Sequence, residues 1–357
     1  MSKTRVAVIF GGMSSEYEVS LKSAASVIRN MPKDKIEVVC VGITEAGRWL
    51  YFPGDVDEIE KGTWQSHPDC VAAIISPDRS HKGILKLLND DVCTLLKIDC
   101  VFPVLHGKNG EDGTIQGLLT LSGIPYVGCD TLSSATCMDK AITHIRLENA
   151  GIKTAPFATV MRPEIAKLEQ KVDVMIKELG LPLFVKPANA GSSVGITKAT
   201  SREELVDGIK LAFSHDRKVV IEKAIVGKEV EVAVLGNDYP EGSIVGEITP
   251  ESGWYDYEAK YIANTSKLTI PARLDPSVAA AVQSIAVEAY IAMGCSGLSR
   301  VDFFVSDDDE IILNEINTLP GFTSISMYPK LWDKMGVSYS ELLERLVEFA
   351  IERDEYI

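Results

Sequence analysis

The chain has 357 residues, of which 46% are hydrophobic and 24% are charged, a composition typical of a folded protein with more than one core. Its formal net charge of −15 argues against nucleic-acid binding, because no general basic surface is available to neutralise a phosphate backbone. No apolar stretch approaches the roughly 20 residues that a bilayer span requires, so we expect a protein that does not cross a membrane.

The N-terminus and the cysteines indicate where the protein works. The first residues lead directly into a strand-like segment at 6–10, without the apolar leader and small-residue cleavage site of a secreted protein. Seven cysteines occur without CxxC or CxxH spacing, which suits reduced thiols better than a disulfide framework or a zinc site. Both observations predict a cytoplasmic protein.

Strand and helix patterns alternate along the first hundred residues. Strands are predicted at 5–10, 36–42 and 99–105, with a helix through 20–28 after the first of them. This alternation is typical of an open parallel α/β sheet. Ser15 and Glu18 have the spacing of a capping box at the start of the helix.

Two glycine-containing strand tips belong to this sheet. Gly11 and Gly12 end the first strand, and the segment 105–113 precedes a helix predicted at 114–121. Ligands bind beyond the carboxyl ends of parallel strands, so both tips are candidate binding loops.

A second unit is predicted from about residue 131. Its helices are predicted at 131–150 and 163–179, and its strands at 182–186 and 218–225. The segment 187–195 contains several glycines and serines and is predicted to be a flexible loop. Ser201 and Glu204 have capping-box spacing for a further helix.

The last part of the chain contains strands and two more helices. The strands are predicted at 229–235, 299–305 and 310–314. Asp275 and Pro276 open the first helix, and Gly294 ends it. Ser338 and Glu341 have capping-box spacing for the final helix, which carries one apolar stripe.

The short connection between the last two predicted strands makes them a hairpin, and this hairpin carries the clearest chemical signal. Side chains alternate along a strand, so Asp302, Glu315 and Asn317 can converge on one face. Such hard oxygen ligands suit magnesium. Arg300 lies two residues from Asp302 and would place a cation beside the metal, as phosphoryl transfer requires. The alternative is that these carboxylates are ordinary exposed strand residues.

The motifs together resemble a known family. Arg-Val-Asp at 300–302, Asn-Glu-Ile-Asn-Thr-Leu-Pro-Gly-Phe-Thr at 314–323 and Phe-Val-Lys-Pro-Ala-Asn-Ala-Gly-Ser-Ser-Val-Gly at 184–195 are similar to the ATP-grasp fold and, within it, to the D-alanine–D-alanine ligases. The resemblance spans nearly the whole chain.

This resemblance implies a fold and a division into domains. The fold class would be α/β, with α+β character in the ATP-grasp part. An N-terminal substrate-binding domain would occupy residues 1–127, a central ATP-grasp subdomain 128–220, and a C-terminal subdomain with the metal and substrate site 221–357. The resemblance also implies a homodimer.

The same resemblance implies how ATP is bound. Asp302, Glu315 and Asn317 would hold two Mg²⁺ or Mn²⁺ ions against its phosphates. The remaining nucleotide-binding positions implied are Lys140, Lys186, Ser193, Glu222, Lys223, Ile225, Glu229, Lys260 and Asn314. Among these, the lysines at 140, 186 and 260 would contact phosphates, and the acids of the adenosine pocket would take ribose hydroxyls. Taken singly, each lysine is more often a solvated surface charge.

The family pattern also implies the substrate-binding and catalytic residues. Glu16 would bind the ammonium of the first D-alanine, in a hydrogen-bond network with Ser192 and Tyr261. His106 would lie near this substrate, although a lone histidine is more often structural. Arg300 and the Gly321 N–H would stabilise the tetrahedral oxyanion formed when the second amine attacks an acyl phosphate. The expected product is D-alanyl-D-alanine for peptidoglycan synthesis.

The second substrate is predicted from the Ser-x-Tyr-Pro motif. Ser326 is followed by Met327, which offers an apolar wall to a methyl group, whereas D-serine-forming relatives commonly carry arginine there. The alternative is a D-alanine–D-serine ligase of the vancomycin-resistance type, which the N-terminal half and residues 265–268 resemble somewhat.

Two other functions fit parts of the sequence. Another ATP-grasp ligase would keep Arg300 and the metal ligands but lack Glu16 and Tyr261. A dinucleotide-binding module would need Gly-x-Gly-x-x-Gly, and the first strand tip instead carries Glu16, whose charge would repel a pyrophosphate.

Overall fold

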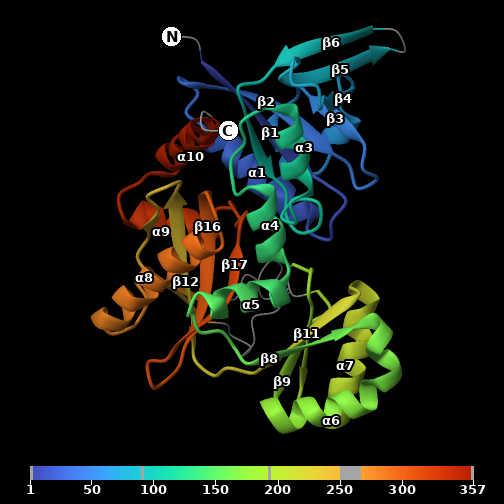
Figure 1. Cartoon of the computed structure of the whole chain (residues 1–357). Coiled ribbons are helices and arrows are strands. Elements are labelled where there is room, and N and C mark those ends of the chain that lie inside the picture. Colours follow the sequence, from blue (N-terminus) through green and yellow to red (C-terminus); the bar gives the residue numbers. More distant parts are fainter. Residues whose placement is uncertain (1–2, 90–91, 192–193, 250–266, 355–357) are drawn as a thin grey trace.

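The computed structural model describes residues 3–89, 92–191, 194–249 and 267–354, which form three β-sheets with helices packed around them (Figure 1). Among these residues, no helix has both the length and the apolar composition that crossing a bilayer would take. Each sheet lies within or close to one of the three predicted domains. The predicted boundaries at 127 and 220 remain a prediction, and one strand of the central sheet runs past the second of them, to Lys223.

The N-terminal sheet has seven strands in the order β6-β5-β4-β3-β2-β1-β7. Its strands are β1 (Thr4–Gly11), β2 (Ile36–Ile43), β3 (Trp49–Phe52), β4 (Val71–Ile75), β5 (Gly83–Asn89), β6 (Val92–Lys97) and β7 (Cys100–Val104). The associated helices are α1 (Tyr17–Asn30), α2 (Val56–Glu60), the 3₁₀ helix η1 (Trp64–Ser66) and α3 (Thr114–Ser122).

This sheet is mixed: the three strands predicted from the sequence, β1, β2 and β7, are parallel as expected, and the further strands β3 to β6 are antiparallel. Only β1 pairs in parallel, with β2 and β7, and every pairing from β2 to β6 is antiparallel. The reason lies in the connections, because parallel neighbours need a crossover of a dozen or more residues. The turn between β2 and β3 and the β5–β6 hairpin are too short for one. The predicted α/β class holds, and the antiparallel extension adds four strands to it.

The start of α1 also differs from its prediction. Glu16 rather than Ser15 is the N-cap residue, and no side chain caps the helix, so the capping box is absent. The Ser14 hydroxyl instead accepts a hydrogen bond from the Glu16 N–H at 3.1 Å. Glu16 thereby stays at the carboxyl end of β1 with its side chain available to the site.

A central four-stranded sheet has the order β10-β9-β11-β8 and is entirely antiparallel. Its elements are β8 (Phe157–Met161), the 3₁₀ helix η2 (Arg162–Lys167), α6 (Leu168–Leu179), β9 (Leu183–Pro187), β10 (Thr197–Ala199), α7 (Arg202–His215) and β11 (Lys218–Lys223). Figure 1 shows α6 and α7 together on one side of this sheet, where their apolar residues form a separate core. The predicted cap of α7 is present, with the Ser201 side chain accepting from the Glu204 N–H.

The third sheet is antiparallel and forms around the central pair β12 and β16. Its elements are β12 (Lys228–Gly236), β13 (Glu241–Gly242), β14 (Gly246–Thr249), β15 (Lys267–Thr269), α8 (Pro276–Ala292), β16 (Gly297–Val305), β17 (Ile311–Asn317), α9 (Met327–Lys334) and α10 (Tyr339–Asp354). A core of valine, alanine and aromatic side chains joins α8 to one face of the sheet. On the other side, α10 contacts α1 and β7 of the N-terminal sheet.

Two helices connect the sheets where one helix had been predicted. The predicted helix 131–150 is divided at Asp139 into α4 (Thr131–Met138) and α5 (Lys140–Asn149). Asp139 leaves the helical conformation, and its carboxylate accepts a hydrogen bond from the Ile142 N–H. Lys140 therefore becomes the first residue of a new helix that faces the central sheet.

Arg353, near the end of α10, holds the N-terminal and C-terminal sheets together. Its guanidinium donates to the carbonyl oxygens of Gly128 and Tyr126 and to the Ser296 hydroxyl, and it lies 4.6 Å from the centre of the Tyr126 ring. Charged hydrogen bonds of this kind contribute more than neutral ones.

Replacing Arg353 by alanine is therefore expected to lower the free energy of unfolding by about 2–4 kcal/mol, because two carbonyl groups lose their donors. Chemical denaturation would measure the change. Arg345→Ala is the matched control on the same helix. Arg345 forms a solvent-accessible i,i+4 pair with Glu341, so this substitution should lower the free energy of unfolding by less than about 0.5 kcal/mol. Equal losses in the two variants would contradict the proposed role of Arg353.

Candidate active site

A cavity of about 710 Å³ lies where the three sheets meet. Its wall includes the following residues predicted from the sequence: Glu16, His106, Lys140, Lys186, Glu222, Lys223, Ile225, Glu229, Arg300, Asn314, Glu315, Asn317, Gly321, Ser326 and Met327. Asp302 lines a smaller pocket that shares Asn314 and Glu315 with it. Ser192, Ser193, Lys260 and Tyr261 lie outside the described residues. All the predicted positions that the structure describes are thus brought to one place.

The hairpin of β16 and β17 positions the charged residues. Arg300 pairs with Asn317 and Asp302 with Glu315, so the four residues lie directly across the two strands from each other. Beyond this point the register shifts, because Phe303 pairs with Leu313 and Asn314 has no partner in the register. A β-bulge of this type re-aims a side chain. Asn314 and Glu315, although consecutive, therefore both line the cavity.

Arg300 is the centre of a buried charge cluster. Its guanidinium makes two hydrogen bonds to Asp302, of 2.8 and 2.7 Å, and an ion pair of 3.2 Å with Glu231. Asp302 and Glu231 are 8% and 5% exposed, so neither carboxylate is well hydrated. Burial acts to lower the pKa of Arg300, but the nearby charges of Asp302 and Glu231 outweigh it and raise the pKa well above its ordinary value. Arg300 is therefore a permanent cation at the cavity wall.

The predicted metal ligands have the chemistry that a divalent metal requires. Asp302, Glu315 and Asn317 offer two carboxylates and one amide, and hard oxygen donors of this kind suit Mg²⁺ or Mn²⁺. The Asn317 amide nitrogen donates to Asp302 at 3.0 Å, which leaves its oxygen for another partner. In the described part of the chain, no three His, Cys, Asp or Glu side chains form a metal-binding group. Because the third predicted ligand is an amide, this observation does not oppose the prediction.

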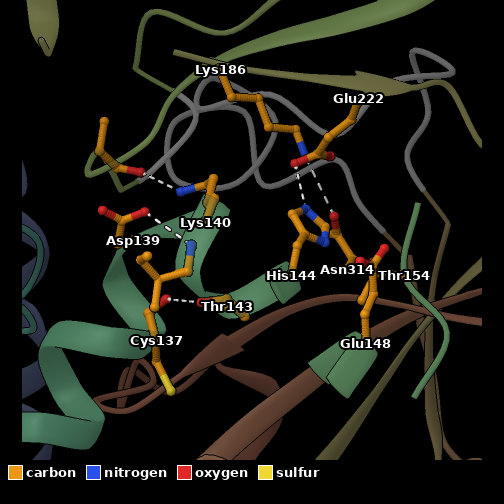
Figure 2. Close-up of polar contacts among 12 residues, drawn as sticks. Cys137, Asp139, Lys140, Thr143, His144, Glu148, Thr154, Lys186, Glu222 and Asn314 are labelled. Carbon is orange, nitrogen blue, oxygen red and sulfur yellow. Dashed lines mark hydrogen bonds and ion pairs between the residues drawn. The ribbon is translucent and has the colours of Figure 1, made fainter. Parts of the chain in front are cut away.

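A second ion-pair network surrounds Lys186 on β9 (Figure 2). Its ammonium lies 2.6 Å from Glu222 and 3.4 Å from the Asn314 amide oxygen. The other oxygen of Glu222 contacts His144 Nε2 at 3.0 Å, and the His144 ring stacks on Phe157. Both carboxylate oxygens of Glu222 therefore have protein partners. His144 was not predicted, because a single histidine in a helix gives no sign of a partner 78 positions away.

Burial acts to raise the pKa of Glu222, but the charge of Lys186 and the contact with His144 outweigh it and lower the pKa to about 2. A depressed carboxylate pKa stabilises the fold above the unfolded pKa, near 4.5, and this stabilisation is lost as pH falls towards 2. At pH 7, Glu222→Gln should therefore lower the free energy of unfolding by about 3 kcal/mol.

Chemical denaturation of the wild type and of Glu222→Gln at several acidic pH values would test this expectation. The difference between their free energies of unfolding should become smaller as pH falls below about 4.5. Glu37→Gln removes an exposed partner of Arg5 and is the control, with an expected change below about 0.5 kcal/mol. A difference that stays constant down to pH 2 would show that the charge of Glu222 is not what matters.

Lys140 reaches the cavity from the start of α5. Its ammonium donates to the Ala190 carbonyl at 2.8 Å, and its backbone N–H donates to the Ala188 carbonyl at 3.1 Å. The preceding Asp139 is paired with Lys218 on β11 at 2.5 Å. The break between α4 and α5 thus places a lysine and a helix N-terminus beside the glycine- and serine-containing loop.

Two glycines make room for the buried carboxylate of Glu16. A Cβ atom on Gly107, whose φ is +69°, would lie 2.2 Å from Glu16 Oε2, and one on Gly191 would lie 2.7 Å from the same atom. Gly107 belongs to the tip after β7 and Gly191 to the loop after β9. Larger residues would displace the carboxylate, so these glycines allow three distant segments to meet around Glu16.

Glu111 is a second acid at this end of the cavity, and it was not predicted as a site residue. Burial and then the charge of Glu16 raise the pKa of Glu111 to about 8, although one of its oxygens accepts the Gly107 N–H at 2.8 Å. Nearby His106 is also buried, and burial lowers its pKa to about 4, so it is neutral at pH 7. Its Nε2 contacts the Ser23 hydroxyl at 3.1 Å.

The loop from Gly321 to Ser326 completes the wall. The Ser326 hydroxyl accepts the Thr323 N–H at 3.0 Å, and a Cβ atom on Gly321 would lie 2.8 Å from that hydroxyl. Met327 is buried beneath the loop and packs against Gly246 of β14, where a Cβ atom would lie 2.7 Å from its sulfur. Met327 is therefore closely packed, and the same loop and helix also give Thr323, Ser326 and Lys330 to the cavity lining.

Comparison with known proteins gives a consistent result along the chain. The family model described as D-ala D-ala ligase N-terminus matches residues 5–129, and the one described as D-ala D-ala ligase C-terminus matches residues 147–348. The D-alanine–D-alanine ligase of Acetivibrio thermocellus is 50% identical, covering 98% of this chain and 96% of the relative. That of Caldicellulosiruptor bescii is 49% identical, covering 99% and 97%.

Solved structures give the same fold. The VanG D-Ala:D-Ser ligase from Enterococcus faecalis superposes with a TM-score of 0.89 at 44% identity, covering 98% of this chain and 100% of that one. The D-alanine-D-alanine ligase from Coxiella burnetii superposes with a TM-score of 0.87 at 33% identity, covering 99% and 97%.

Proposed function

The chain belongs to the D-alanine–D-alanine ligase family, and we propose from this premise that it joins two molecules of D-alanine into D-alanyl-D-alanine, for peptidoglycan synthesis, while converting ATP to ADP and phosphate. The observation that carries the proposal is the cavity shared by the two lysines, the Arg300 cluster and Glu16. The cavity is lined by a cation that can stabilise the oxyanion, by ammonium groups that can bind phosphates, and by a carboxylate that can bind an amino group.

The reaction is proposed to begin with activation of the first D-alanine. Glu16 binds the ammonium group of this D-alanine. The carboxylate of the D-alanine attacks the γ-phosphorus of ATP, the bond from this phosphorus to the β–γ bridging oxygen breaks, and ADP and an acyl phosphate are formed. Lys140 and Lys186 contact the phosphates and reduce the repulsion between two anions that must approach. A metal held by Asp302, Glu315 and Asn317 would supply further charge neutralisation at the phosphates.

The second half of the reaction uses Arg300. The neutral amine of the second D-alanine attacks the acyl carbon, and negative charge develops on the former carbonyl oxygen. Arg300 and the Gly321 N–H are proposed to stabilise this oxyanion before phosphate leaves. Asp302 and Glu231 hold the guanidinium in a fixed orientation, so little reorganisation is needed during the step.

The two acids of the nucleotide pocket, Glu222 and Glu229, are proposed to have different roles. Both oxygens of Glu222 contact Lys186 and His144, so we propose that Glu222 orients the lysine and that Glu229 takes the ribose hydroxyls. The adenosine site would be completed by Lys223, the last residue of β11, and by Ile225 just after it. A cytoplasmic location is proposed because the reaction uses ATP and all seven cysteines are free thiols. We also propose a homodimer.

D-serine is the competing second substrate, because the VanG D-Ala:D-Ser ligase is structurally similar. The curated relatives named D-alanine–D-alanine ligase at 50% and 49% identity and the apolar wall formed by Met327 favour D-alanine. The test measures phosphate release with ATP, Mg²⁺ and D-alanine alone, then with D-serine added, and identifies the product by mass spectrometry. Rapid release with D-alanine alone is expected. Negligible turnover until D-serine is added would overturn the choice, and turnover with neither would overturn the ligase proposal.

A further inference from the structure

Helix α5 carries a buried histidine that lies behind the wall of the cavity. The His144 side chain is 2% exposed, and His144 is not among the described residues that line the cavity. Its Nε2 lies 3.0 Å from Oε1 of Glu222, which does line the cavity (Figure 2). Against the effect of burial, the charge of Lys186 and the contact with His144 lower the pKa of Glu222 to about 2. The carboxylate is therefore ionised and accepts, and His144 carries its proton on Nε2.

The other ring nitrogen indicates that packing alone does not explain this histidine. Among the described residues, none is hydrogen-bonded to Nδ1 of His144, which is buried. A buried polar atom without a partner lowers stability, and an aliphatic side chain of similar size would pack there without this penalty. The His144 ring stacks on Phe157 with 4.6 Å between the ring centres, which fixes the direction of Nε2. The feature that requires a histidine is therefore the hydrogen bond from Nε2 to Glu222.

This hydrogen bond determines how Glu222 meets Lys186. Oε2 of Glu222 lies 2.6 Å from the Lys186 ammonium, so each carboxylate oxygen has its own partner. The last torsion of a glutamate side chain is soft, and a carboxylate held only by Lys186 could rotate and present either oxygen to it. The donor on His144 removes this freedom. The Lys186 side chain is 13% exposed, so few water molecules are available to hold its ammonium in place instead.

The same helix carries the other lysine that is proposed to contact the phosphates. Lys140 and His144 are four residues apart and therefore lie on one face of α5. The Lys140 ammonium donates to the Ala190 carbonyl in the loop after β9 at 2.8 Å. Further along the helix, Nε of Arg146 donates to the Ala292 carbonyl at the end of α8 at 2.7 Å. Helix α5 is thus fixed between the central sheet and the helix that packs on the C-terminal sheet.

We propose that His144 is a positioning residue, which holds Glu222 so that the Lys186 ammonium is kept at a fixed distance from Lys140 for binding the phosphates of ATP. This inference rests on the proposed function, because it takes the two lysines as phosphate ligands. His144 acts through Glu222 and contacts neither ATP nor D-alanine. Its substitution should therefore weaken nucleotide binding and leave the D-alanine site around Glu16 nearly unchanged.

The test compares substitutions of His144 that differ only in where they offer an N–H donor. His144→Leu has none, His144→Asn offers an amide no farther out than Nδ1, and His144→Gln offers one near the position of Nε2. Calorimetry with a non-hydrolysable ATP analogue and Mg²⁺ would measure nucleotide affinity of the full-length proteins, and steady-state ADP release would give kcat and the KM for each substrate. Tyr290→Phe is the structural control, because it removes a buried hydrogen bond of 2.7 Å to the Gly236 carbonyl.

We expect nucleotide affinity to fall about tenfold in His144→Leu and His144→Asn, with a similar rise in the KM for ATP and less than about a twofold change in the KM for D-alanine. His144→Gln should bind nucleotide within about threefold of the wild type. Tyr290→Phe should lower the midpoint of chemical denaturation and leave nucleotide affinity unchanged.

Three results would contradict the role of His144. They are unchanged nucleotide affinity in whichever of His144→Leu and His144→Asn folds, an equal loss in His144→Gln, and an equal rise in the KM for D-alanine, which would indicate a general loss of structure. The first two are read against a wild type that binds the nucleotide. A wild type that binds none would overturn the proposed function itself, and this inference with it.

Discussion

Replacing Arg300 by lysine is expected to lower kcat for dipeptide formation by about 10²- to 10³-fold while nucleotide affinity changes only a few-fold. Lysine keeps the positive charge but not the planar pair of N–H donors that holds Asp302 at 2.8 and 2.7 Å. The cation would no longer be fixed where the oxyanion forms. Steady-state ADP release would measure kcat, and calorimetry with ATP would measure binding.

Lysine is a better probe than alanine at this position. Arg300→Ala should also nearly abolish turnover, but it leaves Asp302 and Glu231 as buried carboxylates without their cation, which typically costs about 3–5 kcal/mol of stability. Arg273→Lys is the matched control, since Arg273 pairs with Glu247 on β14 but is 60% exposed, and its kcat should change less than twofold. Intact turnover in folded Arg300→Lys would remove the guanidinium from the proposed mechanism.

The hairpin that carries Arg300 shows which parts of the site could be predicted from the sequence. Strand patterns and the short connection after Val305 were sufficient to predict that Asp302 faces Glu315, and the structure pairs them. The bulge at Asn314 was not predictable from these patterns, because strict alternation would turn Asn314 away from Glu315. The two residues line the cavity together only because one residue is added to β17 relative to β16.

Long-range contacts explain the other site residues that were missed or differently used. Nothing near His144 or Glu222 in the sequence indicates that they touch each other and that Glu222 also holds Lys186. Glu111 was visible only as part of a glycine-rich motif, and its raised pKa depends on burial beside Glu16. Such effects depend on tertiary packing, whereas strand and helix patterns report only local environment.

The same limit applies to the fold. Local signals predicted most helix starts, including Ser201 before α7. They did not predict the division of α4 from α5, because Asp139 interrupts a continuous helical pattern and its carboxylate is paired with Lys218 of another sheet. The antiparallel strands of the N-terminal sheet were also not predicted, since their short apolar segments have no distinct periodicity.

The second large expected effect concerns the metal. Glu315→Gln should raise the Mg²⁺ concentration for half-maximal activity by about 10- to 100-fold, because one of the two predicted carboxylate ligands becomes a neutral amide. Activity at fixed ATP over a range of Mg²⁺ concentrations would measure this shift. Binding of Mn²⁺, followed by its electron spin resonance signal without turnover, should weaken in parallel. Glu310→Gln, an exposed residue just before β17, is the control.

The stability of the metal-free protein should be much less sensitive to this substitution. Glu315 shares the cavity wall with the like charges of Glu16 and Glu231, which repel it, and with Arg300, which attracts it. Because these effects oppose each other, Glu315→Gln should change the free energy of unfolding by less than about 1 kcal/mol in the presence of a chelator, and should lower it relative to wild type when Mg²⁺ and ATP are present. If Glu315 served only the fold, its substitution would destabilise the protein both in chelator and in the presence of Mg²⁺ and ATP. A loss of stability in chelator together with normal Mn²⁺ binding would assign Glu315 to the fold and would leave the two ions without their proposed ligand.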